Sequence, residues 1–219
     1  MTSISSWVDN NQQVRFIDFM QQALYAPQYG SYASTVPKIG QHGDFITAPE
    51  LTPLFGYTLA NQCMEILSCV EQAQILEFGA GTGRLCVDIL TALESKNALP
   101  SNYFILEVSG GLKAIQQQTI NESIPHLAEH VQWLTAWPDN FTGVRLANEV
   151  LDAMPVHRFK LDQDELWESY ISLNEQTELQ ELWLPLDNGP LFDYLQQAVL
   201  PFNLPQPYCS EVNLLAIGW

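Results

Sequence analysis

The stretch Ile75-Leu76-Glu77-Phe78-Gly79-Ala80-Gly81-Thr82-Gly83 decides the fold of this 219-residue chain. A short apolar run ends here in glycines at alternate positions, and a helical pattern of apolar residues continues to Leu93. Glycine has no Cβ, so the backbone can turn tightly and approach a ligand closely. The N–H groups at the start of the following helix then face that ligand. The stretch therefore predicts a strand, a ligand-binding loop and a helix.

The spacing of these glycines separates two classes of nucleotide-binding protein. Dinucleotide-binding enzymes carry G-x-G-x-x-G, whose third glycine packs the helix on the strand. Arg84 stands at that position, which disfavours a nicotinamide-dependent oxidoreductase. The observed G-x-G-x-G, preceded by an acidic residue, is typical of methyltransferases that use S-adenosyl-L-methionine (SAM), which has no pyrophosphate. The candidate cofactor residues are Glu77, for the methionine ammonium, and the loop residues Gly79, Ala80, Gly81, Thr82 and Gly83.

A second acidic residue supports a SAM site. Glu107 ends the next apolar run, about 24 residues past Gly83, close to the offset of roughly 20 residues expected of a ribose-binding carboxylate. A carboxylate there can accept hydrogen bonds from both ribose hydroxyls. The alternative is a strand-turn-helix with incidental glycines and a solvated glutamate. The apolar strand, the alternating glycines, the helix and Glu107 together favour the cofactor site.

Further short apolar runs continue the same alternation along the chain. Strands are expected at 74–78, 103–108, 130–134 and 144–147, with helices at 83–93 and 112–120 between the first of them. Strands that alternate with helices predict an α/β, Rossmann-like parallel sheet with helices on both faces. Ligands of such sheets bind beyond the carboxyl ends of the strands.

The flanking segments have other patterns. Residues 16–24 and 48–69 have helical periodicity, whereas 156–161, 166–173 and 178–184 indicate an inserted antiparallel meander, followed by a helix at 191–200. We therefore divide the chain into an N-terminal helical segment with a cofactor-lid loop (1–70), a SAM-binding core (71–155) and the meander with its helices (156–219).

The last residues suggest that the chain ends before the fold is complete. The segment 210–219 opens like a helix, and only four parallel strands precede it. A parallel sheet with one exposed apolar edge is prone to pair with another chain. A homodimer is one expected way to cover that edge.

The composition limits the partners. The formal net charge is -17, from 25 acidic and 8 basic residues, which repels nucleic acid and anionic membranes and suits a cationic partner, although solubility alone also explains it. The four cysteines form no CxxC pair, so neither a metal site nor a disulfide framework is expected. The sequence shows neither a signal peptide nor a membrane-spanning stretch, and these features predict a cytoplasmic protein without membrane insertion.

Several motifs together resemble one family. The motifs that carry the resemblance lie at 43–50, 76–83 and 147–156, and the pattern at 19–32 precedes them. Through them the chain resembles the MidA family, which includes the mitochondrial complex I assembly-factor methyltransferases. The resemblance implies a class I methyltransferase fold, SAM as cofactor and methylation of a protein arginine, with a respiratory-complex subunit as one implied substrate. It also implies cofactor roles for Asp44 and Thr47, although 47–50 has the pattern of a capping box. Family members continue well past the motif seen here at 210–213.

The acceptor site is expected after the fourth strand. Asn148, Glu149 and Asp152 lie there, where the methyl group of SAM faces in this architecture. Two carboxylates can hold a planar guanidinium by paired hydrogen bonds, and Glu149 could accept its proton. The alternative is a turn capped by Asn148 or Asp152. His42 and His157 have no paired acid that the sequence identifies, so neither is a candidate base.

Two functions remain open on the sequence alone. The first is a SAM-dependent methyltransferase that acts on a protein arginine by direct methyl transfer. The second is a catalytically inactive SAM-binding factor that assembles with a partner. The glycine loop and the two carboxylates favour the first, and the missing end of the fold favours the second.

Overall fold

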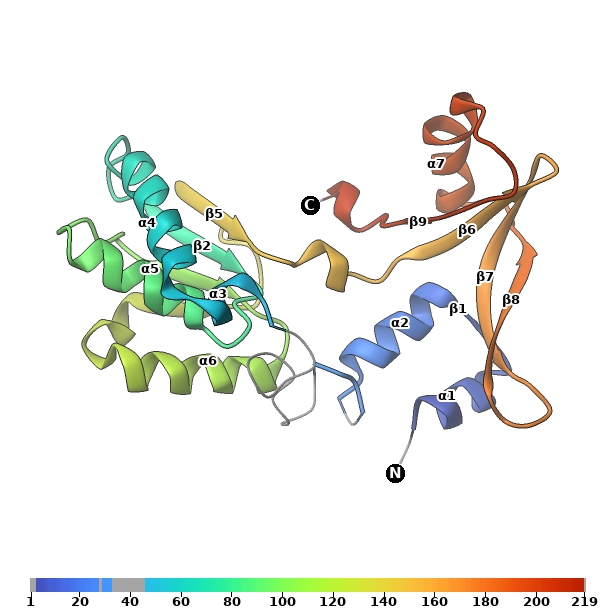
Figure 1. The fold of residues 1–219 in the computed structure, drawn as a ribbon, viewed down its shortest axis with the longest axis horizontal. Helices are drawn as coiled ribbons and strands as arrows, with labels where there is room; N and C mark the ends of the chain where they lie inside the picture. The colour runs from blue at the N-terminus through green and yellow to red at the C-terminus, as the bar shows by residue number, and fades with distance from the viewer. Residues whose placement is uncertain (1–2, 28, 33–45, 219) are drawn as a thin grey trace. The chain divides into compact units, whose positions relative to one another are not determined.

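The computed structural model describes residues 3–27, 29–32 and 46–218. The chain forms two compact units, drawn in Figure 1. Tyr32–Val150 is the parallel-sheet unit, and Met1–Ser31 with Leu151–Trp219 is the antiparallel-sheet unit. The sequence predicted boundaries at 70/71 and 155/156. The observed division differs because residues 1–70 contribute to both units.

The parallel-sheet unit contains the predicted four-stranded sheet. Its strands are β2 (Gln74–Phe78), β3 (Tyr103–Leu106), β4 (Val131–Leu134) and β5 (Gly143–Ala147). They are all parallel and follow the order β4-β3-β2-β5. This arrangement confirms the predicted α/β fold class and brings the carboxyl ends of the four strands to one edge.

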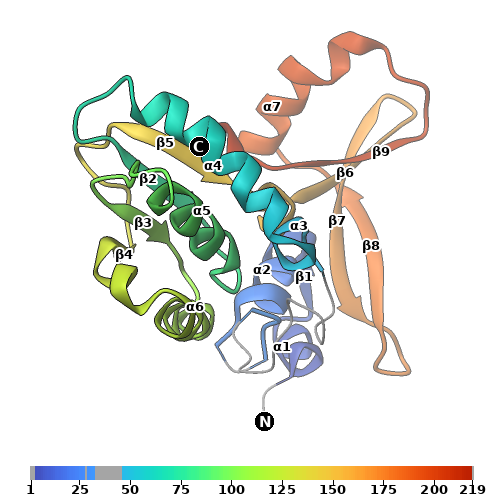
Figure 2. The same ribbon diagram turned by 60° about the vertical axis from the view of Figure 1, so that its left-hand side comes forward.

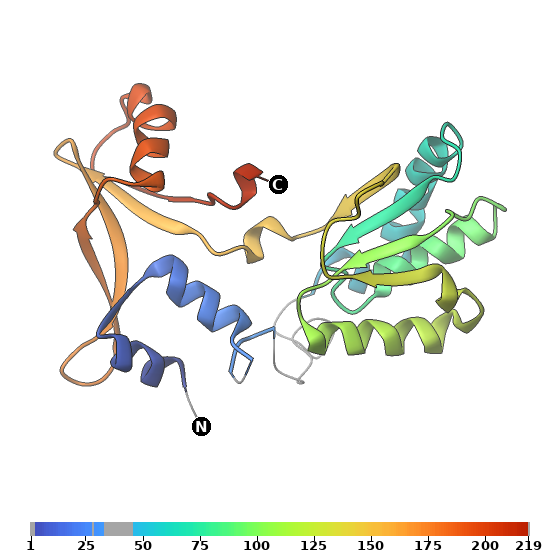
Figure 3. The ribbon, with the colours of Figure 1, turned by 180° about the vertical axis from the view of Figure 1, so that it is seen from behind.

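Three helices pack on one face of this sheet. Figures 2 and 3 show α4 (Pro53–Leu67), α5 (Arg84–Glu94) and α6 (Gly110–Ser123) on the same side of the strands. The core between them is apolar and includes Ala60, Cys63, Ile75, Cys86, Ile89, Leu90, Leu93, Tyr103, Ile105, Ile120, Val131 and Val144. The sequence predicted helices on both faces, and the described residues provide them on one.

Aromatic and cationic side chains lie on the other face. The rings of Phe78 and Trp137 have centroids 5.5 Å apart, and the guanidinium of Arg145 lies 4.5 Å from the Trp137 centroid. Arg145 is the register partner of Leu76 in the neighbouring strand. This contact covers part of the strand surface through the loop that leads into β5.

The single helix expected at 48–69 is wrong. The structure has a short α3 (Ala48–Leu51) and a separate α4, divided at Thr52, whose backbone is extended. Pro53 explains the break, since the residue before proline is pushed out of the helical conformation. The Thr52 hydroxyl then accepts from the Leu54 N–H at 3.3 Å and caps α4.

The antiparallel-sheet unit contains the predicted meander. Its strands are β6 (His157–Asp162), β7 (Glu165–Leu173) and β8 (Leu179–Pro185), joined by β1 (Gln13–Arg15) and β9 (Tyr208–Val212). The strand β7 pairs with β8 along one side, and with β6 and β1 in succession along the other, while β9 pairs with the free side of β6. The helices of this unit are α1 (Ile4–Asn11), α2 (Phe16–Tyr25) and α7 (Pro190–Ala198).

Two parts of this unit differ from the sequence prediction. The helix expected at 210–219 is wrong, because Tyr208–Val212 is a strand and only Ala216–Gly218 forms a 3-10 turn. The strand β1 and the helix α1 were not predicted. A three-residue strand such as β1 exists because β7 offers it a partner, and no local pattern marks that partner. No helix of the described residues is long and apolar enough to cross a membrane.

Candidate cofactor and acceptor site

The glycine loop has the conformation that its sequence requires. Gly79, Gly81 and Gly83 have φ values of 58°, 53° and 86°, in the left-handed region that residues other than glycine rarely adopt. Gly83 is also the residue at the N-cap of α5, so the loop delivers the chain directly into the helix. A Cβ at Gly83 would lie 3.2 Å from Cα of Gln116. The loop therefore packs closely against α6.

Glu107 follows β3 directly and lies beside the loop. Its side chain is buried, and both carboxylate oxygens already have a protein donor. Oε1 accepts from the Ser109 N–H at 2.8 Å, and Oε2 accepts from Nε2 of Gln116 at 2.8 Å. Each carboxylate oxygen has two lone pairs, so one position on each oxygen remains for a ligand hydroxyl. The arrangement fits a pair of neighbouring ribose hydroxyls.

Glu77 is the next-to-last residue of β2, just before the loop, and its side chain is buried. It is 3 % exposed, and the Tyr103 hydroxyl donates to its Oε2 at 2.6 Å. Burial raises the pKa of Glu77 to about 7, a net effect to which the negative charge of Glu107 adds and which the Tyr103 hydrogen bond opposes. A buried carboxylate of this kind favours a cationic ligand group.

The charges around the loop argue against a phosphate ligand. Arg84 is the basic residue next to the loop, and its Nε contacts Asp88 Oδ1 at 3.2 Å. Three carboxylates surround the loop, that of Glu50, which contacts Thr82, and those of Glu77 and Glu107 at the ends of adjacent strands, and they would repel a pyrophosphate. Hydroxyls and an ammonium group match these acceptors. The site thus fits the nucleoside and amino-acid parts of SAM.

The helix α3 touches the loop through its acidic residue. The Thr82 hydroxyl donates to the Glu50 carboxylate. Thr47 is at the N-cap of α3 as expected, but its side chain makes no capping hydrogen bond, so the capping-box interpretation is wrong. Glu50 contacts the glycine loop in place of the backbone of Thr47. Asp44 lies outside the described residues.

The residues after β5 come to the same edge of the sheet. Phe78 pairs with Leu106 on one side and with Ala147 on the other, so the residues that follow these three positions are aligned. Asn148 is half-buried and Glu149 is exposed, with Glu149 in the left-handed region at φ 52°. A Cβ on Gly79 would lie 3.7 Å from Val150 Cγ2, which places this segment beside the loop.

Asp152 belongs to the other unit. It is exposed in a 3-10 turn, Leu151–Ala153, of the antiparallel-sheet unit. The joint role of Glu149 and Asp152 stays a prediction. The structure does bring Asn148 and Glu149 to the edge that carries Glu77, Glu107 and the glycine loop.

The sequence did not predict a role in this site for two of its buried residues, Tyr103 and Gln116. Tyr103 donates to Glu77, and Gln116 donates both to Glu107 and to the Gly81 carbonyl. The sequence did carry one signal, because Gln116 stands between Leu112 and Ile120 at four-residue spacing, on the apolar side of the helix. A polar residue in such a stripe needs buried partners.

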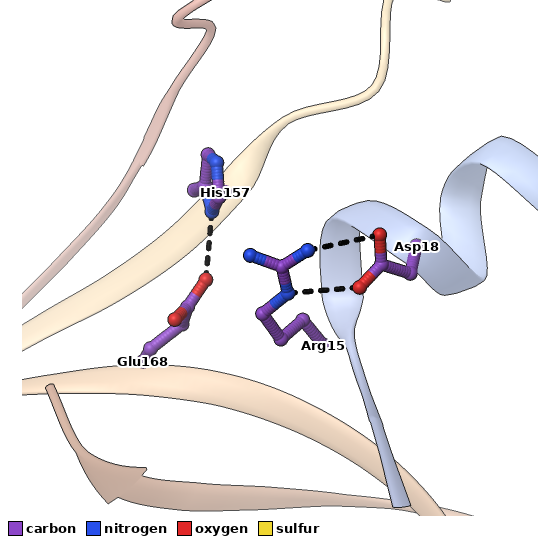
Figure 4. A network of polar contacts seen from close by, with 4 residues as sticks. All are labelled: Arg15, Asp18, His157 and Glu168. Carbon is purple, nitrogen blue, oxygen red and sulfur yellow. Dashed lines mark hydrogen bonds and ion pairs between the residues drawn. The ribbon is translucent and has the colours of Figure 1, made fainter. Parts of the chain in front are cut away.

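A second polar network lies in the antiparallel-sheet unit. Figure 4 shows His157 and Glu168 facing one another from neighbouring strands, with Arg15 paired with Asp18 beside them. His157 Nδ1 and Glu168 Oε1 lie 2.7 Å apart. The expectation that His157 has no paired acid is wrong. The two residues lie on different strands, which pairing alone brings together. Each satisfies a buried polar atom of the other, which accounts for the pair as part of the sheet.

Comparison with known proteins identifies the family. A family model described as "Putative S-adenosyl-L-methionine-dependent methyltransferase" matches residues 58–219. A crystal structure of a Burkholderia thailandensis protein bound to S-adenosyl-homocysteine superposes with a TM-score of 0.87 at 32% identity, over 98% of this chain and 57% of that one. This chain belongs to that family of SAM-dependent methyltransferases, as its resemblance to MidA predicted.

Curated relatives carry a more specific name. The Caenorhabditis elegans "Protein arginine methyltransferase NDUFAF7 homolog, mitochondrial" is 29% identical over 185 residues, which is 74% of this chain and 43% of that protein. The Drosophila melanogaster homologue is 30% identical over 66% of this chain and 38% of its own length. The chain thus spans less than half of the length of these relatives.

Proposed function

We propose that this chain binds SAM at the edge formed by β2, β3 and β5 and transfers its methyl group to a protein arginine side chain. One observation carries the proposal: two buried carboxylates, Glu77 and Glu107, flank a loop of left-handed glycines at the ends of adjacent strands. The related Burkholderia structure with bound S-adenosyl-homocysteine supports it.

Each cofactor residue has a proposed role. Glu107 accepts the ribose hydroxyls, and Glu77 holds the methionine ammonium, directly or through water. Gly79, Ala80, Gly81, Thr82 and Gly83 form the backbone surface against which the cofactor lies. Thr47 and Asp44 are proposed cofactor residues on the resemblance to MidA, and the contact between Glu50 and Thr82 supports a role for the segment around α3.

Methyl transfer needs an aligned nucleophile more than covalent help from the protein. When bound, SAM supplies a methyl carbon that is electrophilic because it is attached to a sulfonium. A guanidinium nitrogen forms the new bond to that carbon, and the pair of electrons of the broken carbon–sulfur bond stays on sulfur. The nitrogen then loses a proton, for which Glu149 is the proposed acceptor. Asn148 and Asp152 are proposed to orient the guanidinium.

Three observations support arginine as the acceptor. The curated relatives are named protein arginine methyltransferases. The net charge of -17 favours a basic protein segment. A carboxylate such as Glu149 also suits the planar donors of a guanidinium. By resemblance to MidA, a subunit of a respiratory complex is the proposed class of substrate.

The first experiment is a calorimetric titration of the full chain with S-adenosyl-homocysteine. We expect binding by the wild type, lost or greatly weakened in Glu107→Ala. Glu122→Ala, which removes an exposed glutamate of α6, is the matched control and should bind as the wild type does. A folded wild-type chain that shows no binding would refute the proposed cofactor site.

A second experiment separates catalysis from binding alone. Isotope-labelled SAM is incubated with a basic peptide that contains arginine and with the same peptide carrying lysine instead. We expect label in the arginine peptide, and a strongly reduced rate in Glu149→Gln with unchanged affinity for S-adenosyl-homocysteine. Binding without transfer to either peptide would favour the alternative function, a SAM-binding assembly factor.

A further inference from the structure

We infer that Gln116 is a positioning residue for the cofactor, which holds the glycine loop and the Glu107 carboxylate in a fixed relation to one another. The inference rests on the proposed binding of SAM at this site. Gln116 lies in α6 and is fully buried. Its side chain contacts both the glycine loop, at Gly81, and Glu107, which are separate in the sequence. These two would hold different parts of the cofactor.

The amide of Gln116 joins three partners. Nε2 donates to Oε2 of Glu107 at 2.8 Å and to the carbonyl of Gly81 at 3.1 Å. Oε1 accepts from the indole Nε1 of Trp133 at 2.9 Å. Both N–H groups and the carbonyl are therefore engaged. A side chain with this many fixed bonds has little rotational freedom, and neither do the groups that it holds.

The partners fix which way the amide points. The indole of Trp133 can only donate, whereas the Gly81 carbonyl and an ionised Glu107 can only accept. The opposite orientation of the amide would break all three hydrogen bonds. It would place the amide N–H groups against the indole N–H, and the amide oxygen against the oxygens of Gly81 and Glu107. Trp133 therefore selects the orientation in which Gln116 supports Glu107. The three residues act as one unit.

The backbone geometry reinforces the same connection. Gly83 approaches Gln116 so closely that a Cβ on it would lie 3.2 Å from Cα and 3.4 Å from the carbonyl oxygen of Gln116. The loop thus lies against the backbone of α6 at the residue whose side chain holds it. Ser109 adds a second constraint, since its N–H donates to the other oxygen of Glu107 at 2.8 Å. Glu107 can then meet ribose hydroxyls without reorganisation.

The test compares affinities for S-adenosyl-homocysteine by calorimetry in the full chain. Gln116→Met keeps the length and the helical preference of the side chain and removes its hydrogen bonds. We expect it to bind at least roughly tenfold more weakly than the wild type. Gln117→Met, at the exposed neighbouring position of the same helix, should bind as the wild type does.

Two further readouts separate positioning from general stability. If Gln116 acts through Glu107, Gln116→Met in the Glu107→Ala background should cost little additional affinity. The variant should also lose discrimination between S-adenosyl-homocysteine and its analogue without ribose hydroxyls. If Gln116→Met fails to fold, Trp133→Phe decides the question, since it removes the indole donor, keeps an aromatic ring and leaves Gln116 in place. It is expected to weaken binding in the same ribose-dependent way.

The outcomes are distinct. Wild-type affinity in Gln116→Met, or losses that add fully to those of Glu107→Ala, would overturn the positioning role while SAM binding stands. A folded wild-type chain that does not bind S-adenosyl-homocysteine would refute the proposed function, and the positioning role with it. Unchanged binding by a folded Trp133→Phe would show that the indole does not orient the amide and would also count against the inference.

Discussion

Glu77 couples the stability of the protein to pH. Burial raises its pKa from the ordinary value of 4.5 to about 7 in the folded chain. Between these values the folded carboxyl is protonated while the unfolded one is ionised, so the folded state binds more protons and stability falls as pH rises. The loss is complete above about 7 and is on the order of 3 kcal/mol.

Glu77→Gln removes this ionisable group and keeps an acceptor for Tyr103. We expect the free energy of unfolding of this variant, relative to that of the wild type, to increase as pH rises from about 4.5 to about 7. Above about pH 7 the difference between the two proteins should stay constant. Denaturant unfolding at a series of pH values measures the difference. A difference that does not vary over that interval would show that Glu77 ionises normally in the folded chain.

Glu149 adopts a backbone conformation that suits glycine better. Its φ of 52° places a non-glycine residue in the left-handed region, beside the proposed acceptor site. We expect Glu149→Gly to raise the free energy of unfolding by up to about 1 kcal/mol and to abolish most methyl transfer.

Gln163 provides the control for Glu149. It has the same φ of 52° in the turn between β6 and β7, in the other unit. Gln163→Gly should stabilise the chain similarly without changing the rate of methyl transfer. If Glu149→Gly transferred methyl groups at the wild-type rate, the proposed proton acceptor would be wrong.

At the scale of elements, α4 and α5 meet at a glycine. A Cβ on Gly56 would lie 2.5 Å from Cβ of Asp88, a separation that requires the two helices to move apart. We expect Gly56→Ala to destabilise the chain by about 1–3 kcal/mol, because overpacking a helix contact has that cost. Thermal unfolding measures it. Gly110→Ala, where a Cβ meets nothing within 4 Å, should be neutral, and equal effects of the two would contradict the close approach.

The elements show which sequence patterns predict structure. Apolar runs and glycine spacing predicted all four parallel strands, the loop and the meander, because each is a local pattern. The break at Thr52 was also local, and Pro53 marks it. No local pattern predicts the strand β9. The apolar residues after it favour a helix, and only its pairing with β6 makes it a strand.

The same distinction holds for the site. Glu77, Glu107 and the glycine loop follow from spacing along the chain. The hydrogen bond from Tyr103 to Glu77 and that from Gln116 to Gly81 join residues 26 and 35 positions apart, which only the packed sheet and helices bring together. The pair of His157 and Glu168 likewise depends on strand register. Such contacts are decided by tertiary packing, and a single sequence does not display them.

For the whole molecule, the net charge of -17 predicts a salt effect on the acceptor. Attraction of a basic peptide by many carboxylates is screened at high ionic strength. We expect the KM for the arginine peptide to rise several-fold between about 0.05 and about 0.5 M salt, with little change in the affinity for S-adenosyl-homocysteine. Steady-state kinetics and calorimetry test this. A KM that does not change with salt would show that local contacts, and not the overall charge, select the substrate.

The edge of the parallel sheet bears on the proposed homodimer. Among the described residues, β5 pairs with β2 on one side only. A free strand edge is a template for pairing with another chain. We expect light scattering over a range of protein concentrations to detect a dimer. A monomer at all concentrations would refute the homodimer, which stays a proposal, as does the predicted cytoplasmic location.

The division of the chain into units also sets an order of events on the ribosome. The parallel-sheet unit is one uninterrupted stretch, so it can fold as soon as residue 150 has left the exit tunnel. The other unit cannot close then, because Val14 pairs with Ile171 and β6 must wait for β9. The strand β1 therefore stays unpaired until β7 has been synthesised. A nascent chain would complete its parallel sheet while β1 still waits for β7.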